Sequence, residues 1–422
     1  MGLGVLSILS VILSFIILAI IVLRKGPIFL GILSAAFIVI ILNFVFYRNF
    51  PIETILDKAF LDYKNLRTLA IILFMLTLTG VISSTKLNKI LEESARNAFS
   101  DRRHIIVLIP SIIGLIPMPA GALVSAILVK NSLNPKNTPP EILTASNYWF
   151  RHVWEYFWIF YQAVIYEQVL VDLSLTKIML LQAPFALTGI LLGIFYFYPK
   201  LKEFKRNNKR RDIRSFVKIL YSGWPIFLTV SIVLAFTLIS SIFSLKISAP
   251  DVLVATLPIV IVFTILIHRP SKNDLKENLK KSMKPPLIAA ILAAFFYRAT
   301  IETYNIAEGF TTYLSSLGFP IITLIAILPF AIGLLTGISF AYVTVAFPIL
   351  LPIITNAPAV YAPMAYAFGH FGMMLSPAHF CLIFSNEFFE SKLHKTYKHV
   401  FIIAGANTIL ATLISLLYFK IY

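Results

Sequence analysis

Residues 104–129 read HIIVLIPSIIGLIPMPAGALVSAILV, an apolar run with helix-breaking prolines and glycines near its middle. Basic residues precede this run between positions 86 and 103 and follow it at Lys130 and Lys136, which favours the cytoplasmic side for both flanks. A helix rises about 1.5 Å per residue, so this run is too short to cross about 30 Å of hydrocarbon twice. The stretch therefore predicts a re-entrant hairpin that enters and leaves on one side, with a kinked single span as the alternative.

A second apolar run, at 319–351, repeats this pattern. It breaks at Gly333-Leu-Leu-Thr-Gly-Ile-Ser339, and its flanks carry no Lys or Arg, which predicts a hairpin that enters from the outside. A polar stretch of helical period precedes each hairpin, at 86–103 and 302–317. Both stretches are predicted to be amphipathic helices that lie in the membrane interface.

The composition places these segments in a membrane protein. Of the 422 residues, 59% are hydrophobic and 13% are charged, whereas about 25% of the residues of soluble domains are charged. The formal net charge of +17 sits in short loops between apolar runs, where the positive-inside rule and anionic lipids explain it without nucleic acid. Membrane lipids are therefore expected partners and nucleic acid is not. The one cysteine, Cys381, excludes internal disulfides.

The predicted fold is an all-α polytopic membrane protein with about ten transmembrane helices and two re-entrant hairpins in two inverted repeats. Equivalent elements are offset by about half of the chain and separated by an odd number of crossings, which predicts the inversion. The first repeat, 1–205, holds the spans 3–23, 28–47 and 68–85, the hairpin 104–129, the broken span 142–170 and the span 176–198. The second repeat, 206–422, holds the spans 218–244, 250–268 and 285–300, the hairpin 319–351, the broken span 359–386 and the span 399–419.

The basic loops orient the chain. Lysine and arginine gather at 200–214, at 269–284 and at 391–398, so these loops are predicted to be cytoplasmic. Both termini are then predicted to lie outside. The expected location is the cell (cytoplasmic) membrane, crossed several times.

The segment Asn147-Tyr-Trp-Phe-Arg-His-Val-Trp-Glu155 follows the first hairpin. Arg151, His152 and Glu155 lie deep in an apolar run, where charges are costly and normally face a bundle interior or an aqueous path. Arg151 and Glu155 are four residues apart, so they are expected to share a helix face and neutralise one another. The group is either an ion pair that locks two helices or a cluster that binds substrate or ion. Two spaced ligands do not make a metal cage, so no metal beyond Na⁺ is expected.

The corresponding segment of the second half is Gly369-His-Phe-Gly-Met-Met-Leu-Ser-Pro-Ala-His-Phe380. Pro377 removes one backbone donor. An unwound turn at Ser376-Pro377 would present main-chain groups to an anion or to Na⁺, with an ordinary proline kink as the alternative. His370 and His379 are either part of this site or packed, hydrogen-bonded histidines.

The hairpin tips carry small and hydroxylated residues. Such residues let the backbone approach a ligand and supply neutral donors, and small-residue helix packing is the alternative explanation. The candidate binding residues of the tips are Pro117, Pro119, Ala120, Gly121 and Ser125 in the first hairpin and Thr336, Gly337 and Ser339 in the second.

Sequence motifs of several other protein classes are absent. The chain has no Walker A sequence, no H-E-x-x-H and no G-x-S-x-G, which are the motifs of P-loop ATPases, zinc proteases and α/β-hydrolases. We therefore expect a transporter rather than an enzyme, with no cofactor apart from Na⁺ or H⁺ as coupling ion. Arg298 and Glu302, four residues apart near the end of a span, are expected to form a structural ion pair.

Three stretches resemble a known family. Gly114-Leu-Ile-Pro-Met-Pro-Ala-Gly-Ala-Leu123, the segment 147–155 and Ser376-Pro-Ala-His379 are similar to an integral-membrane family of bacteria and archaea with a domain-of-unknown-function label, which belongs to the ion transporter superfamily. The resemblance covers the whole chain. It implies a relation to transporters of citrate, other dicarboxylates, gluconate and arsenite and to Na⁺/H⁺ exchangers.

This resemblance also implies a mechanism. It implies a homodimer with elevator motion, in which the outer spans form a scaffold and the hairpins and broken helices move with substrate and Na⁺ at their tips. The dicarboxylate branch carries Ser-Asn-Thr sequences at these tips, whereas this chain has Pro-Met-Pro-Ala-Gly and Thr-Gly-Ile-Ser. The substrate and the Na⁺ coupling of that branch therefore do not carry over.

The expected function is an ion-coupled secondary active transporter that moves a small, anionic, carboxylate-like solute across the cytoplasmic membrane by an elevator mechanism. One alternative is a Na⁺/H⁺-type cation antiporter, in which Glu155 and His152 exchange protons. The other is an intramembrane enzyme that uses His152, Glu155 and His379, which would have to lie within hydrogen-bonding reach of one another.

Overall fold

The structure is a computed structural model that describes residues 2–98, 102–115, 121–132, 138–171, 173–201, 213–244 and 247–421. Within these ranges every regular element is a helix and there is no strand. Among the described residues, seven helices are long and apolar enough to cross a membrane. The chain is thus an all-helical, multi-pass membrane protein, as the sequence predicts.

Three of the expected spans differ from these seven long helices. The expected span 218–244 divides at Gly223 into α11 (Ile213–Ser222) and α12 (Trp224–Ile242), because Pro225 starts a new helix in its first turn. The expected spans 142–170 and 359–386 each contain two helices around an irregular turn. Each half of these two segments is too short to cross about 30 Å of hydrocarbon at about 1.5 Å per residue.

Residues 3–84 and 224–303 form one layer, called here the long-helix layer. Within it, α1 packs on α2, α2 on α15, α4 on α13 and α14, and α12 on α13. Two short helices, α3 and α14, were not expected, and α14 occupies most of the predicted basic loop 269–284. The layer consists of α1 (Leu3–Leu23), α2 (Ile28–Tyr47), α3 (Ile52–Phe60), α4 (Tyr63–Ser84), α12, α13 (Ala249–His268), α14 (Lys272–Ser282) and α15 (Pro285–Thr303).

Residues 102–197 and 324–417 form a second layer, called here the broken-helix layer. Within it, α6 packs on α7 and α8, α17 on α18 and α19, and α10 on α21. The layer consists of α6 (Arg102–Leu115), α7 (Gly121–Ser132), α8 (Pro140–His152), α9 (Gln162–Leu170), α10 (Leu175–Phe197), α17 (Leu324–Thr336), α18 (Ser339–Ile354), α19 (Pro358–Met374), α20 (Phe380–Phe388) and α21 (Leu393–Leu417).

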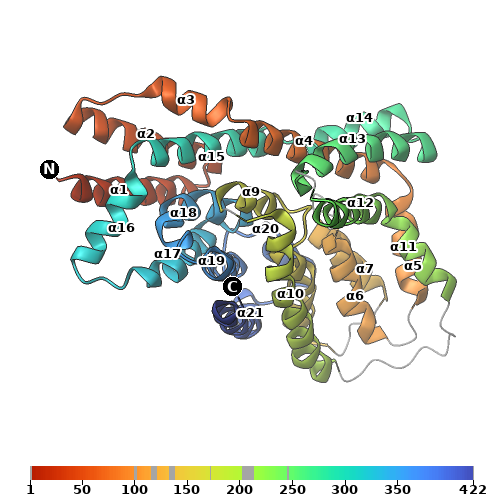
Figure 1. Ribbon diagram of the computed structural model, residues 1–422. Coiled ribbons are helices and arrows are strands. Elements are labelled where there is room, and N and C mark those ends of the chain that lie inside the picture. The colour runs from red at the N-terminus through yellow and green to blue at the C-terminus, as the bar shows by residue number, and fades with distance from the viewer. Residues whose placement is uncertain are drawn as a thin grey trace.

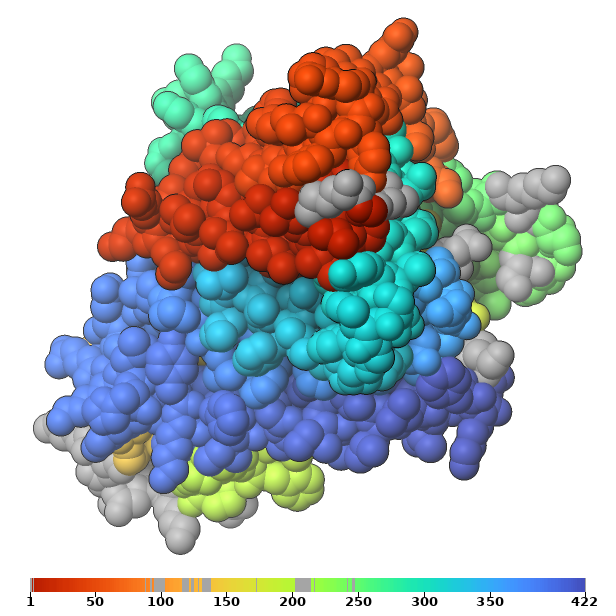
Figure 2. Space-filling model, turned by 90° about the vertical axis from the view of Figure 1, so that its left-hand side faces the viewer, coloured from red at the N-terminus to blue at the C-terminus, as the bar shows by residue number. Residues whose placement is uncertain are grey.

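Short helices connect the two layers. The helices α5 (Leu87–Ala98) and α16 (Ile306–Ser316) lie where the sequence predicts connecting helices at 86–103 and 302–317. α5 packs on α11, and α16 packs on both α1 and α18. Figure 1 shows α2, α3, α13, α14 and α15 along the top of the view, with α10 and α21 below. Figure 2 shows the same stacking from the side, with the N-terminal helices above the C-terminal third of the chain.

Both runs that predict hairpins are divided into two helices that pack on each other. α6 ends at Leu115 and α7 begins at Gly121. The predicted tip residues Pro117, Pro119 and Ala120 lie outside the described residues, as do the boundary predicted near 205 and most of the loop 200–214. In the second run, α17 ends at Thr336 and α18 begins at Ser339. Gly337 turns the chain between them with φ of 65°, a conformation that glycine adopts without a steric penalty.

Candidate functional site

Aromatic side chains hold the first broken segment against the end of α6. This segment consists of α8, a 3-10 turn at Val153–Tyr156 and α9. The Trp158 Nε1 donates to the Leu115 carbonyl at 3.0 Å, and the Tyr161 hydroxyl donates to the Gly114 carbonyl at 2.6 Å. Carbonyls in the last turn of a helix lack partners inside that helix, so these side chains satisfy the buried end of α6.

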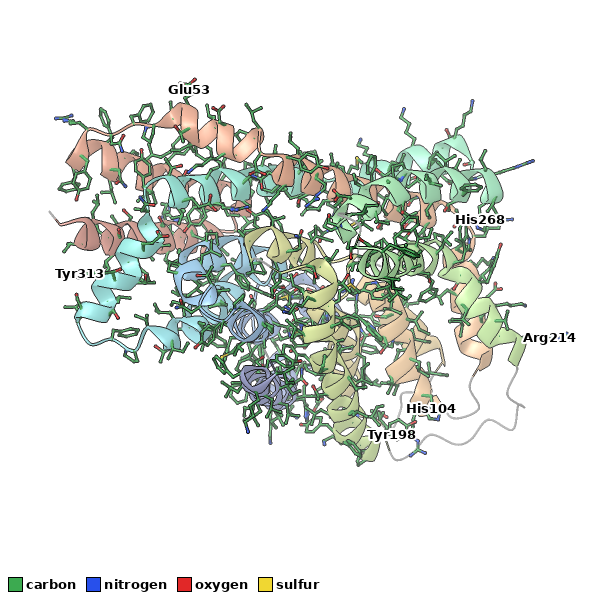
Figure 3. All side chains as sticks on the ribbon, in the orientation of Figure 1. Glu53, His104, Tyr198, Arg214, His268 and Tyr313 are labelled. Carbon is green, nitrogen blue, oxygen red and sulfur yellow. The ribbon has the colours of Figure 1, made fainter. Side chains whose placement is uncertain are left out.

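Gly114 brings α6 into direct contact with the end of α8. A Cβ atom on Gly114 would lie 2.3 Å from the carbonyl oxygen of Arg151, which no side chain can do without moving one of the two backbones. The start of α6 is held as well, because His104 hydrogen-bonds Tyr198 at the end of α10, at the lower edge of Figure 3. The backbone of Arg151 is therefore positioned by α6.

Glycines give the second broken segment an equally close contact. A Cβ on Gly333 of α17 would lie 2.3 Å from the carbonyl oxygen of Gly369 in α19. A Cβ on Gly337 would lie 2.8 Å from the backbone nitrogen of His379, in the irregular turn between α19 and α20. The turn between α17 and α18 thus presses directly on the break between α19 and α20.

Buried hydrogen bonds tie the two broken segments to each other. The Tyr366 hydroxyl of α19 donates to the Glu155 carbonyl at 2.7 Å, and the Tyr148 hydroxyl of α8 donates to the Met374 carbonyl at 3.3 Å. His370 Nε2 donates to the carbonyl of His152 at 3.2 Å. Each of these bonds joins a side chain of one segment to the backbone at the break of the other.

A charged cluster lies where the two breaks meet. His152 Nε2 is 3.1 Å from His379 Nε2 and 3.7 Å from Glu155 Oε1. Nη1 of Arg151 lies 3.4 Å from His152 Nε2 and donates to the Cys381 sulfur at 3.4 Å. Arg151, His152, Glu155 and His379 are each more than nine-tenths buried. The cluster therefore combines a permanent cation, two imidazoles, a carboxylate and a thiol inside the protein.

The expected pairing of Arg151 with Glu155 is wrong in detail. The α-helix ends at His152 and continues as a 3-10 turn, so residues four apart no longer share a face. In this geometry Glu155 approaches His152, three residues before it. Among the described residues Arg151 has no ion-pair partner within 4 Å, and its buried Nε has no hydrogen-bond partner. A buried guanidinium without a carboxylate partner is costly.

The cluster lines a cavity of about 320 Å³. The cavity lies between the broken-helix layer and the α4 and α14–α15 region of the long-helix layer. Arg151 lines it as a buried cation, and Lys281 and Lys284 lie at its exposed rim, where Lys281 pairs with Glu277 at 2.5 Å. Among the described residues, Glu155 is the one acidic side chain that lines the cavity. The other lining residues are Leu76, Thr79, His152, Tyr161, Gln162, Ser282, Leu287, Gly337, Ile338, Ser339, Met373, His379, Phe380 and Cys381.

Three helices begin at this cavity. α9 starts at Gln162, α18 at Ser339 and α20 at Phe380, and all three residues line the cavity. None of these N-termini has a side-chain cap. The first backbone N–H groups of a helix lack internal partners and carry partial positive charge. The broken helices thus add backbone donors to the cationic side chains of the cavity.

The structure brings together six of the candidate binding residues: Arg151, His152, Glu155, Gly337, Ser339 and His379 all line the cavity. The other described candidates lie elsewhere. Asn147 donates to the Ser385 hydroxyl and the Ala122 carbonyl, which joins α8 to α20 and α7. Ser125 and Thr336 bond to carbonyls of their own helices.

The remaining candidates lie close to the break in the second segment. His370 stacks on Tyr156 with ring centroids 4.1 Å apart, and Ser376 accepts a hydrogen bond from the Ala378 backbone. Pro377 is exposed in the break, and Gly121 is buried at the start of α7. These residues support the backbone of the site without lining the cavity.

Sequence analysis did not assign Cys381, Lys281 or Lys284 to the site. Cys381 is two residues after His379, so it follows the break in the first turn of the next helix. Lys281 and Lys284 end the basic loop that precedes α15. Basic residues in a loop indicate orientation, and a basic residue next to a span carries no local sign that it faces a cavity.

Two larger grooves have no such chemistry. One, of about 570 Å³, is lined by apolar side chains and two threonines of α19 and α21, and another, of about 500 Å³, by apolar residues of α2, α3 and α15. Within the described parts of the chain, no charged residue lines either groove. Apolar grooves on the outside of membrane helices are suited to lipid chains, so the charged cavity is the candidate functional site.

The long apolar helices and the charged cavity define a polytopic helical membrane protein with a polar site that opens to the surface. The chain belongs to the family described as a protein of unknown function (DUF401), which matches residues 5–418. A search of curated proteins finds no match to the chain. The predicted membership in a domain-of-unknown-function family is confirmed, and the link to the ion transporter superfamily stays a prediction.

Proposed function

We propose that this protein is an ion-coupled secondary active transporter that moves a small, anionic, carboxylate-like solute across the cytoplasmic membrane. The observation that carries the proposal is Arg151, a buried cation on a cavity wall with no acidic partner within 4 Å among the described residues. Removing a charge from water is costly unless a counter-charge compensates it. A carboxylate or inorganic anion in the cavity would supply that counter-charge and accept from the free Nε of Arg151.

The surroundings of Arg151 favour an anion as well. Lys281 and Lys284 line the same cavity, and three helices have their N-termini there. Helix N-termini bind anions through their free N–H groups and their dipole. Broken helices whose N-termini meet near mid-membrane are also typical of substrate sites in secondary transporters.

The predicted pair of inverted repeats is part of this proposal, and the contacts at the site support it. Tyr148 and Tyr366 are 218 residues apart, as are His152 and His370. The two tyrosines make exchanged hydrogen bonds, each to the backbone at the other segment's break. Gly114 touches the carbonyl of Arg151, and Gly333, 219 residues later, touches the carbonyl of Gly369. Two repeats related by a pseudo-two-fold axis are expected to make such reciprocal contacts, between residues that are a constant number of positions apart in the sequence.

The helix packing of the two layers supports the same repeat. α5 packs on α11 as α16 packs on α1, and α7 packs on α20 as α18 packs on α9. The separation into a long-helix layer and a broken-helix layer suits an elevator mechanism, with the first as scaffold and the second as the moving part. The proposal also includes cytoplasmic loops at 200–214, 269–284 and 391–398, termini outside and a homodimer. These features follow from the basic loops and the family resemblance.

The direct test is binding of small anions to the purified protein. A thermal-shift screen in detergent would compare carboxylates and inorganic anions, each with and without Na⁺, because a ligand at about 100 times its Kd stabilises the folded state by about 2.7 kcal/mol. Arg151→Gln should weaken binding of the stabilising anion about 30-fold or more, since loss of a buried charge partner costs about 2–5 kcal/mol. Arg298→Gln is the control, because Arg298 is a half-buried arginine that pairs with Glu302 at 2.6 Å and does not line the cavity.

Transport itself would be measured in proteoliposomes. Uptake of the stabilising anion should stop when the Na⁺ and H⁺ gradients are collapsed. Failure of every anion to shift the melting temperature, or an equal shift in wild type and Arg151→Gln, would contradict the anion site. Flux at channel rates without a gradient would contradict secondary transport.

Cation antiport is the second candidate, and the position of Glu155 favours it. This carboxylate lies in the cavity beside His152, within reach of the Ser339 hydroxyl. An antiporter would move protons when Na⁺ is added to proteoliposomes that contain a pH-sensitive dye, with no anion present, and Glu155→Gln would abolish the signal. A proton flux of that kind would replace the anion proposal.

The enzyme alternative meets its distance requirement for the two histidines, whereas Glu155 lies just beyond hydrogen-bonding distance of His152. His152 lies 3.1 Å from His379 and 3.7 Å from Glu155. A transporter returns its solute chemically unchanged, whereas an enzyme would alter it. Mass spectrometry of the solute recovered from proteoliposomes therefore separates these two functions.

A further inference from the structure

Three metal-binding side chains meet at the cavity. One ring nitrogen of His152, one of His379 and the Cys381 sulfur all lie within 4.8 Å of one another. They come from α8 and from the start of α20, more than 220 residues apart in the chain. Imidazole nitrogen and thiolate sulfur are the ligands that zinc and other thiophilic divalent cations prefer. The segment 147–155 alone offers two possible ligands, His152 and Glu155. The fold adds His379 and Cys381 to them.

His152 is oriented as metal-binding histidines usually are. Its Nδ1 lies 2.6 Å from the carbonyl oxygen of Tyr148, and because a carbonyl only accepts, Nδ1 carries the hydrogen. The neutral ring then has a free lone pair on Nε2, which faces His379 and Glu155. A backbone carbonyl on the other ring nitrogen is the usual way to orient a histidine toward a metal. His379 Nδ1 is buried with no hydrogen-bond partner among the described residues.

The spacing fits a tetrahedral ion after a small adjustment. Zinc holds nitrogen at about 2.0–2.1 Å and sulfur at about 2.3 Å, so its ligand atoms lie roughly 3.3–3.6 Å apart. The two Nε2 atoms are 3.1 Å apart, and the widest separation in the group of three is within 4.8 Å. A change of about 1 Å at the Cys381 side chain closes this gap. Glu155 Oε1, 3.7 Å from His152 Nε2, can supply a fourth ligand.

The guanidinium of Arg151 contacts two of these ligand atoms. Its Nη1 lies 3.4 Å from the Nε2 of His152 and 3.4 Å from the Cys381 sulfur. A guanidinium and a metal cation cannot share these lone pairs, because both are positively charged and both need the same positions. Metal binding therefore requires Arg151 to turn into the cavity, and the arginine competes with the metal.

We propose that His152, His379 and Cys381, with Glu155 as fourth ligand, form a binding site for a thiophilic divalent cation such as Zn²⁺, and that Arg151 is its internal competitor. The site goes beyond the transport proposal and requires no particular solute. The proposed orientation places the Lys281 side of the cavity toward the cytoplasm, where cysteine thiols stay reduced.

The test uses the purified full-length protein in detergent. Zn²⁺ is titrated by isothermal calorimetry, and Co²⁺ serves as a spectroscopic substitute because a thiolate bound to cobalt gives a charge-transfer absorption. We expect one ion per chain and a thiolate–cobalt band. Cys381→Ser should remove the band and weaken Zn²⁺ binding at least about 10-fold, as the loss of one ligand predicts. Arg151→Gln should tighten Zn²⁺ binding about 3-fold or more, since it removes the competing charge.

Controls separate ligand loss from misfolding. His399→Gln is the matched histidine control, because His399 bonds Tyr196 outside the cluster, and it should bind Zn²⁺ like the wild type. The wild type gives a second measurement that needs no variant, because Cys381 is the single cysteine. Zn²⁺ should slow its alkylation by a maleimide at least 10-fold.

Clear outcomes would overturn the metal site. These are the absence of saturable Zn²⁺ binding, equal binding by wild type and Cys381→Ser, a cobalt complex without a thiolate band, or alkylation that Zn²⁺ does not slow. The anion screen of the transport proposal is run with a chelator present. Failure of the metal site therefore leaves the transport proposal standing, and failure of the anion screen leaves the metal site standing.

Discussion

The two broken segments have a similar backbone plan and contribute different chemistry to the cavity. The first, α8 to α9, supplies the charges through Arg151, His152 and Glu155. The second, α19 to α20, supplies His379 and the N-terminus of α20, and the hairpin α17–α18 that packs on it supplies Gly337, Ser339 and the N-terminus of α18. Each segment is held by a glycine contact from the hairpin that precedes it and by a tyrosine hydrogen bond from the other segment. The common plan fixes where the cavity lies, and the differences decide what it can bind.

The glycine contacts offer the largest test of this comparison. Gly114→Ala and Gly333→Ala each place a Cβ 2.3 Å from a carbonyl oxygen, of Arg151 and of Gly369 respectively. Overpacking typically costs about 1–3 kcal/mol and occasionally more, and here both neighbours are backbone, so we expect a loss of about 3 kcal/mol in each variant. Thermal unfolding in detergent should show both midpoints lowered.

Anion binding should separate these two variants. Gly114→Ala moves the backbone of Arg151, so the remaining folded protein should bind the anion at least about 10-fold more weakly, a loss of about 1.4 kcal/mol. Gly333→Ala should change the affinity less than Gly114→Ala, because its Cβ meets the backbone of Gly369 and Met373, and of these only the uncharged Met373 lines the cavity. Equal affinities in the two variants would mean that the first segment has no special role in binding.

Gly337 tests the contribution of the second segment. Gly337→Ala forces φ of 65° on alanine and places its Cβ 2.8 Å from the His379 nitrogen. Gly318→Ala is the matched control, because Gly318 also has positive φ, 74°, but nothing lies within 4 Å of its Cβ position. We expect about 1–2 kcal/mol of destabilisation from the left-handed conformation alone in the control, and about 1–3 kcal/mol more in Gly337→Ala from overpacking.

Binding should again distinguish these two variants. Gly337→Ala displaces the N-termini of α18 and α20, so anion affinity should fall, whereas Gly318→Ala should bind normally. Calorimetric titration of the stabilising anion at equal folded concentration measures both. Wild-type affinity in Gly337→Ala would show that the helix N-termini do not contribute to the site.

The tyrosine pair gives the smallest effects. Tyr366→Phe and Tyr148→Phe each remove one buried hydrogen bond to a carbonyl, of Glu155 at 2.7 Å and of Met374 at 3.3 Å. Leaving a buried acceptor unsatisfied costs about 1–3 kcal/mol, and the shorter bond should cost more. We therefore expect Tyr366→Phe to lower the melting midpoint more than Tyr148→Phe. The reverse order, or no change in either variant, would contradict the exchanged role of the two tyrosines.

Local sequence predicts most of the helix breaks, but not the one at Gly223. Gly337, Pro377 and the long apolar runs are local signals, because a missing Cβ or a missing N–H acts on the residue's own backbone. Pro225 is the same kind of local signal for the break at Gly223. Because the whole run 218–244 is apolar, hydropathy nevertheless predicts a single span there. The sequence therefore predicts where helices form more reliably than whether a helix is interrupted.

The side-chain partners of the site were predicted less well. The pairing of Arg151 with Glu155 assumed a continuous α-helix, and the change to a 3-10 turn after His152 replaced it with a contact between Glu155 and His152. In the sequence, Cys381 indicates only that the chain has no internal disulfide. Its approach to Arg151 depends on how α20 packs on α8, which nothing in its neighbouring residues indicates.

The sequence by itself determined that this is a helical, multi-pass membrane protein with interrupted segments, because span length, charge and helix breaking are properties of short stretches. Only the tertiary structure decided that Arg151, His152, His379 and Cys381 meet on one cavity and that Arg151 has no acidic partner within 4 Å among the described residues. The physical reason is that side chains more than 200 residues apart meet because the two broken segments pack on each other, through bonds such as Tyr148 to Met374 and Tyr366 to Glu155. Those contacts depend on the packing of whole helices, which no short stretch of sequence specifies.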